Sequence, residues 1–229
     1  AASDVYKRQV EHYVQWRIHT RKLVFRRHSP NLTGTNVAMN NSPSRSFDIT
    51  LMGATGFVGA LTADYLAANA PADVRVALAG RNQTKLEALR KQLTAKHPRA
   101  KEFPLVIADS SDNRSLEKLA RDTRVVISTV GPYYRYGFPL VRECATHGTH
   151  YVDLAGEPLF MRESADSYHD IATASGARII HACGFDSVPS DLGMLLLGQR
   201  ASENKDTLET ATMIVKMLSL IHISEPTRP

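Results

Sequence analysis

Three glycines, Gly53, Gly56 and Gly59, have the spacing of a loop that binds the phosphates of a dinucleotide. They follow an apolar, β-branched segment at 47–52 and open an amphipathic segment at 56–70. The first glycine allows a tight turn, the second lets backbone amides approach a pyrophosphate, and the third lets the helix pack close to the strand. The amino end of the helix adds amide donors and partial positive charge. The predicted phosphate loop consists of Gly53, Ala54, Thr55, Gly56, Phe57, Val58 and Gly59.

The residues after the second predicted strand bear on the choice between NAD and NADP. In NAD-binding proteins a carboxylate near this position accepts hydrogen bonds from the 2′-hydroxyl of the adenosine ribose. Here the strand is followed by Gly80, Arg81 and Asn82, with Lys85 about one helical turn further on. Because Arg81 could pair with a 2′-phosphate, the sequence predicts NADP(H) as the cofactor. A surface arginine paired with a nearby acid is the alternative.

Four further residues follow predicted strands, at the sheet edge where ligands bind. Asp109 follows the third strand and is placed to line the adenine, although an aspartate there is also common at the start of a helix. Val130 ends the fourth strand and, with Gly131 and Pro132, is a candidate cofactor-binding residue. Gly131 and Pro132 could shape the floor under the nicotinamide. A purely structural turn is the alternative for these three residues.

From residue 47 onward, short apolar segments alternate with longer amphipathic ones, which is typical of a parallel sheet covered by helices. Strands are expected at 47–52, 74–79, 105–108, 125–130, 150–154 and 177–182. Helices are expected at about 56–70, 84–95, 114–121, 139–146, 159–175 and 190–201. The predicted fold class is therefore α/β, a doubly wound Rossmann domain over residues 47–205, with the strand order 3-2-1-4-5-6.

The two ends of the chain depart from this pattern. Residues 1–9 and 218–229 resemble translated sequencing-library adapter, and we expect the native start at Met39. Residues 1–46 are therefore expected to form a head outside the domain, and a genuine basic arm is the alternative. We expect residues 1–38 and 218–229 to pack against nothing.

The net charge of +5 would favour a nucleic-acid or membrane-surface partner if it were spread over the whole chain. Instead, residues 1–46 contain eight Lys or Arg and two acidic residues. Residues 47–217 contain 19 Lys or Arg and 20 acidic residues, so their charges nearly cancel. We therefore expect no nucleic-acid partner. The sequence also has no apolar run near the roughly 20 residues that cross a bilayer, so no transmembrane segment is expected.

The cysteines and histidines do not predict a metal site. Cys144 and Cys183 are far apart and lack the Cys-x-x-Cys spacing, which also disfavours a disulfide scaffold. His147 and His150 share a turn without further ligands. A cytoplasmic location is the simplest expectation, and peripheral membrane association is left open.

Four motifs occur in order along the chain. They are the phosphate loop, Gly131-Pro132-Tyr133-x-x-Tyr136-Gly137, Tyr151-Val152-Asp153-Leu154-Ala155-Gly156-Glu157 and Gly184-Phe185-Asp186-Ser187-Val188-Pro189-Ser190-Asp191-Leu192-Gly193. Over about 47–200 the chain thereby resembles the saccharopine dehydrogenase-like oxidoreductases, and most of all their bacterial trans-acting enoyl reductase branch. The resemblance implies an NADP-binding Rossmann domain, followed by a second domain that completes the substrate pocket. Only the start of that domain is expected here, at 206–217.

The resemblance implies hydride transfer from NADPH to an enoyl, lipid-like substrate. A saccharopine-type amino-acid dehydrogenase and a non-catalytic NADP-binding or redox-sensing module remain alternatives. A short-chain dehydrogenase is disfavoured, because none of the eight tyrosines has a lysine four positions later. The expected partner is a small-molecule or lipid-like substrate, and a homo-oligomer is compatible with the sequence.

The sequence assigns no catalytic residue. Asp153 and Glu157 follow the fifth predicted strand, where a catalytic acid is conceivable. Ser187, Ser190 and Asp191 are more typical of helix caps than of catalytic groups. His181 lies in an apolar strand and is expected to be a hydrogen-bonded core residue.

Overall fold

The computed structural model describes residues 14–21 and 45–215. Residues 45–187 belong to one compact unit, and residues 14–21 and 188–215 belong to a second. The adapter-like ends and the expected native start at Met39 lie outside the described residues. Within the described ranges, no helix has the length and apolar character needed to cross a membrane.

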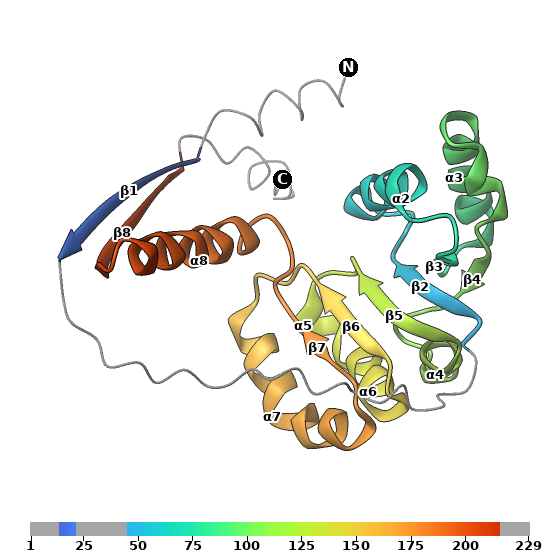
Figure 1. Ribbon diagram of the computed structural model, residues 1–229. Helices are drawn as coiled ribbons and strands as arrows, with labels where there is room; N and C mark the ends of the chain where they lie inside the picture. The colour runs from blue at the N-terminus through green and yellow to red at the C-terminus, as the bar shows by residue number, and fades with distance from the viewer. Residues whose placement is uncertain (1–13, 22–44, 216–229) are drawn as a thin grey trace, which may run out of the picture. The chain divides into compact units, whose positions relative to one another are not determined.

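The first unit contains one six-stranded sheet in which every strand pair is parallel (Figure 1). The strands are β2 (Phe47–Met52), β3 (Val76–Gly80), β4 (Leu105–Ile107), β5 (Thr123–Ser128), β6 (His150–Asp153) and β7 (Ile179–Ile180). Their order, β4-β3-β2-β5-β6-β7, confirms the predicted order 3-2-1-4-5-6. The strand order reverses between β2 and β5, and ligands bind such sheets at the carboxyl ends of the strands on either side of this reversal.

Helices cover both faces of the sheet. They are α2 (Phe57–Asn69), α3 (Gln83–Lys96), α4 (Asn113–Asp122), α5 (Tyr133–Tyr136), α6 (Phe138–His147) and α7 (Pro158–Ser175), with the 3-10 helix η1 (Pro98–Glu102). The predicted helices of this unit are present, and α5 and η1 are additional short turns. Strand β7 has two residues, whereas six were predicted there.

Two apolar cores lie on opposite faces of the sheet, because successive residues of a strand point to opposite sides. Leu51 belongs to the core formed with α2 and α3, and its neighbour Met52 belongs to the core formed with α4, α6 and α7 (Figure 1). All five residues of β3 are buried. A sheet buried on both faces exposes its strand ends, so its carboxyl edge is the place where this unit can present a site.

Arg45, directly before β2, joins the carboxyl ends of two helices. Its guanidinium donates to the carbonyl oxygens of Ala120 and Arg121, both at 2.7 Å, to that of His147 at 2.5 Å, and to Thr149 Oγ1 at 3.1 Å. The last carbonyls of a helix have no partner within it, and a positive charge is favoured beside them. Arg45 is thus bound to the six-stranded unit, although the sequence placed it in the head outside the domain.

We expect Arg45→Ala to lower the free energy of unfolding by about 2–4 kcal/mol. Hydrogen bonds from a charged donor contribute roughly 1.5–3 kcal/mol each, and water replaces part of them after truncation. Urea unfolding of the two proteins measures the difference. Arg162→Ala, which removes an exposed arginine paired with Asp166, is the matched control and should cost less than about 1 kcal/mol. Equal losses in both variants would contradict this role for Arg45.

The second unit contains α8 (Val188–Glu203) and an antiparallel pair of strands, β1 (Val14–Arg21) and β8 (Thr207–Val215). The prediction that residues 1–38 pack against nothing is therefore wrong for β1. The physical reason is the alternation of apolar and polar residues along β1, which is a strand pattern. Strand β8 lies within residues 206–217, the segment in which the start of a second domain was expected.

Helix α8 was predicted at 190–201 as part of a domain that continues to residue 205. The chain instead divides between Ser187 and Val188, so α8 belongs to the unit of β1 and β8. Asp191 lies in the first turn of α8. A negative charge inside the first turn is favourable, which is a different role from the helix cap that was predicted for this residue.

Candidate functional site

The loop between β2 and α2 turns sharply at Gly53, whose φ is +85°. The amides of Gly53 and Ala54 both donate to the carbonyl oxygen of Ala79, at 3.0 and 3.1 Å. A Cβ on Gly53 would lie 2.8 Å from both Thr129 Oγ1 and Val130 Cγ2. Glycine is therefore required here both by the left-handed backbone and by the close approach of the chain after β5.

The other two glycines of the phosphate loop differ in what surrounds them. A Cβ on Gly59 would lie 2.1 Å from the carbonyl oxygen of Gly53 and 2.9 Å from Ala54 Cα, so the packing of α2 on the loop requires glycine. A Cβ on Gly56 would meet only the Gly53 oxygen, at 3.3 Å. Since Gly56 is exposed and has a φ of −74°, the protein's own packing does not require glycine at this position.

The phosphate loop and the first turn of α2 contain both paired amides and amides without an acceptor among the described residues. Gly56 and Ala60 donate to the carbonyl oxygens of Gly53 and Gly56, at 2.9 and 2.8 Å. The amides of Thr55, Phe57 and Val58 have no acceptor among the described residues. All three residues are exposed, and the first amides of a helix carry partial positive charge. The loop can therefore donate several hydrogen bonds to one anionic group.

Arg81 and Lys85 lie at the carboxyl end of β3 and in the first turn of α3, and both are exposed. Asn82 caps α3 by accepting a hydrogen bond from the Lys85 amide at 2.9 Å. Neither cationic side chain forms a hydrogen bond or a salt bridge within the part of the chain that the structure describes. Thr55 Oγ1 would be 3.9 Å from a Cβ on Gly80, so the residue before Arg81 lies next to the phosphate loop.

Asp109, which follows β4, is engaged in its own turn. Its Oδ1 accepts hydrogen bonds from the amide and the hydroxyl of Ser111, at 2.9 and 2.7 Å. These bonds, with a smaller contribution from the positive charge of Arg81, lower the pKa of Asp109. The cap of α4 is Asp112, which accepts from the Arg114 amide. The structure thus assigns the predicted helix-start role to a different aspartate.

The segment after β5 crosses the strand reversal next to the phosphate loop. Thr129 Oγ1 donates to the carbonyl oxygens of Met52 and Gly53, at 3.1 and 3.2 Å, and so holds the two loops together. Gly131 and Pro132 are exposed and are joined by a cis peptide bond. The structure therefore places these residues at the same edge as the phosphate loop.

Asp153 is 2% exposed and connects the loops after β6 and β7. Its Oδ1 accepts from the amides of Ala155 and Ala182, at 3.0 and 3.1 Å, and its Oδ2 lies 2.7 Å from His181 Nδ1. The other ring nitrogen of His181 lies 3.0 Å from Ser164 Oγ. His181 is thus hydrogen-bonded as predicted, but it follows β7 and is only partly buried, so it is not the core strand residue that was expected.

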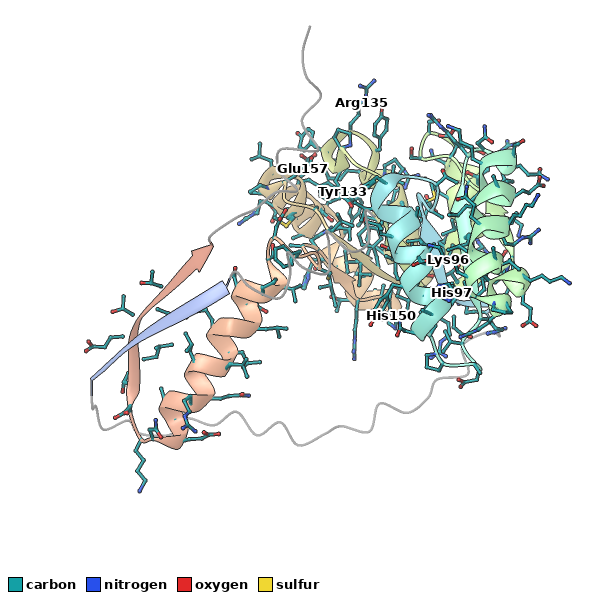
Figure 2. The ribbon with its side chains drawn as sticks, turned by 90° about the horizontal axis from the view of Figure 1, so that it is seen from above. Lys96, His97, Tyr133, Arg135, His150 and Glu157 are labelled. Carbon is teal, nitrogen blue, oxygen red and sulfur yellow. The ribbon has the colours of Figure 1, made fainter. Side chains whose placement is uncertain are left out.

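Glu157 is also engaged within the protein. Its two carboxylate oxygens accept hydrogen bonds from the amides of Tyr133 and Tyr134. Glu157 and Tyr133 are labelled in Figure 2. Both acids considered as catalytic candidates thus accept hydrogen bonds from within the protein. Within the described ranges, no group of three or more His, Cys, Asp or Glu side chains is placed to hold a metal ion.

Two residues that shape the site were not predicted. Asn82 directly precedes a helix, and this position is itself a recognisable signal for a capping residue. Thr129 gives no local signal, because its contacts with the loop after β2 depend on the pairing of β5 with β2.

Comparisons with known proteins relate the first unit to one family. The sequence model of the saccharopine dehydrogenase NADP binding domain matches residues 49–180. A trans-acting enoyl reductase of Mycobacterium leprae is 52% identical over 161 residues, which are 70% of this chain and 38% of that protein. A trans-acting enoyl reductase of Mycobacterium tuberculosis is 51% identical over 160 residues, 70% of this chain and 37% of that protein. The chain thus spans just over a third of the length of these relatives.

Among solved structures, apo saccharopine dehydrogenase (L-Glu forming) from Saccharomyces cerevisiae has a similar fold, with a TM-score of 0.55 and 23% sequence identity. The match covers 69% of this chain and 32% of the yeast chain. It supports the Rossmann-like fold of the six-stranded unit.

Proposed function

The chain belongs to the saccharopine dehydrogenase NADP-binding domain family, and from this premise we propose which residues bind NADP(H) and which reaction they serve. The proposed binding residues are Gly53, Ala54, Thr55, Gly56, Phe57, Val58, Gly59, Arg81, Lys85, Asp109, Val130, Gly131 and Pro132. They come from four loops at the carboxyl edge of one sheet, where a dinucleotide crosses between the two halves of a doubly wound fold.

The phosphate loop carries this proposal. The exposed amides of Thr55, Phe57 and Val58 lack acceptors among the described residues, and they surround Gly56, which the packing of the protein does not require to be glycine. A pyrophosphate supplies the missing acceptors and accounts for the absence of a side chain at Gly56. The donor set and the open space therefore fit a dinucleotide.

The preference for NADP(H) rests on the end of β3. Arg81 and Lys85 are exposed and have no salt-bridge partner among the described residues. Helix α3 begins at Gln83, between them in the sequence. A guanidinium donates well to a phosphate, whereas a bare 2′-hydroxyl would need an acceptor. Asp109, the acid that follows β4, accepts both Ser111 hydrogen bonds on its Oδ1 atom.

We propose that the whole protein reduces an enoyl, lipid-like substrate. This substrate class rests on the names of the mycobacterial relatives, which are trans-acting enoyl reductases. NADPH supplies the hydride when it is bound. The residues of this chain bind and orient the cofactor, and Asp153 and Glu157 hold the loops around it. Contacts that position the substrate are assigned to the part of the relatives' length that this chain does not span.

We expect the 229-residue chain to bind NADPH but to transfer no hydride to an enoyl thioester. Hydride transfer requires the reacting atoms to be held about 3–3.5 Å apart, and the proposed substrate contacts lie outside this chain. Fluorescence titration measures NADPH binding, and the loss of NADPH absorbance in the presence of the thioester measures turnover. A chain that fails to bind NADPH would overturn the proposed function. Turnover by the chain alone would contradict the division of roles.

A further inference from the structure

We propose that Glu157 is a positioning residue for the nicotinamide half of the site. The carboxylate fixes the backbone at Tyr133 and Tyr134 and thereby sets the position of Gly131 and Pro132. This inference rests on the proposed function, because it assumes that a dinucleotide crosses the strand reversal between β2 and β5.

The contact between Glu157 and α5 uses both carboxylate oxygens. Oε1 accepts from the Tyr133 amide at 2.7 Å, and Oε2 accepts from the Tyr134 amide at 2.8 Å. These are the first two amides of α5, and the first amides of a helix have no partner within it. Hydrogen bonds to an ionised acceptor are stronger than neutral ones, so the clamp fixes the turn that follows Pro132.

The side chain of Tyr133 is held independently of its backbone. Its hydroxyl donates to the carbonyl oxygen of Ser128 at 3.1 Å, and burial raises the pKa of the phenol, which keeps it a donor. Its ring centroid lies 5.8 Å from that of Phe160 in α7. The contacts with β5 and α7 fix the ring of Tyr133. The Glu157 carboxylate fixes the Tyr133 backbone and thereby sets the direction of the preceding exposed residues, Gly131 and Pro132.

Glu157 is itself fixed at the end of a constrained loop. It directly precedes α7, whose amino end favours a negative charge. Two residues earlier, the Ala155 amide donates to the buried Asp153 carboxylate, which also binds the loop after β7. The two acids of the Tyr151–Glu157 motif therefore connect the loops after β5, β6 and β7 into one framework.

The topology indicates which half of the dinucleotide meets this framework. Arg81 places the adenosine 2′-phosphate at the end of β3, and the phosphate loop lies at the end of β2. The remaining half must extend over β5, on the other side of β2. The close approach of Thr129 and Val130 to Gly53 puts the start of the β5 loop directly beside the phosphate loop. Gly131 and Pro132 are the next residues along that path.

The test compares two ligands on the full chain. NADPH carries the nicotinamide, whereas adenosine 2′,5′-bisphosphate carries only the adenosine half. In Glu157→Gln one oxygen is replaced by an amino group that cannot accept from an amide, and Glu157→Ala removes both acceptors. Glu117→Gln, which removes a carboxylate paired with Arg121 on α4, is the matched control.

We expect Glu157→Gln to weaken NADPH binding about three- to tenfold and Glu157→Ala about ten- to thirtyfold, while adenosine 2′,5′-bisphosphate changes by less than about twofold. The fluorescence increase of the dihydronicotinamide ring on binding should also fall in both variants. The control variant, Glu117→Gln, should bind both ligands with wild-type affinity. If Glu157→Ala does not fold, Glu157→Gln alone decides the question.

Equal losses for the two ligands, or no loss for either, would overturn the positioning role. Both results differ from a failure of the proposed function, which would appear in the wild type as an inability to bind either ligand and would remove the basis of this inference as well.

Discussion

Gly56→Val is expected to abolish NADPH binding while the six-stranded unit stays folded. Gly56 has φ −74° and ψ 169°, an extended conformation open to any residue. A Cβ there meets only the Gly53 oxygen, at 3.3 Å, which a shift of a few tenths of an ångström relieves. The valine methyl groups would instead occupy the space in front of the unpaired amides. Because glycine is also a better helix cap than valine, a loss of about 1 kcal/mol in the free energy of unfolding is expected.

Gly59→Val is the contrasting variant. Its Cβ would lie 2.1 Å from a backbone oxygen and 2.9 Å from Ala54 Cα, and neither atom belongs to a flexible side chain. We expect this variant to lose at least about 2 kcal/mol of stability together with binding. Urea unfolding and NADPH titration of the two variants separate the effects. Wild-type affinity in a folded Gly56→Val would exclude the phosphate loop from the site.

The sheet could be predicted because its signals are local. Each strand of the first unit is a short apolar segment, and the alternation with amphipathic segments predicts parallel neighbours and their order. Strand β7 is shorter than the strand predicted at 177–182, because only Ile179 and Ile180 pair with β6. The strand β1 was missed although its residues alternate, since no neighbouring segment indicated a partner and β8 lies far along the chain.

The candidate site also contains features with local sequence signals and features that depend on contacts between distant residues. Gly53 and Gly59 could be assigned from spacing, since the turn and the start of the helix are adjacent in sequence. The contacts of Glu157 with Tyr133 and of Asp153 with His181 span 24 and 28 residues. They arise only when parallel strands bring successive loops to one edge. The sequence could therefore indicate the acids but not their partners, which the structure shows to be backbone amides and His181.

Arg81→Ala is expected to weaken NADPH binding by roughly ten- to a hundredfold and to leave NADH binding nearly unchanged. Charge-assisted hydrogen bonds contribute about 1.5–3 kcal/mol, and each 1.4 kcal/mol is about a factor of ten in affinity. Arg81 is exposed and forms no salt bridge within the described residues, so its removal leaves no buried partner uncompensated. Lys85→Ala should have a smaller effect of the same sign, because an ammonium interacts with phosphate as a point charge.

Titration of the wild type and the variants with both cofactors, at two salt concentrations, measures these effects. The preference of the wild type for NADPH should shrink as salt rises, because the charges are exposed and screened. Arg162→Ala, which removes an exposed arginine of α7, should bind both cofactors like the wild type. Equal affinities of the wild type for NADPH and NADH, or equal losses of both in Arg81→Ala, would show that Arg81 does not recognise the 2′-phosphate. The phosphate loop would then account for dinucleotide binding without selecting between the two cofactors.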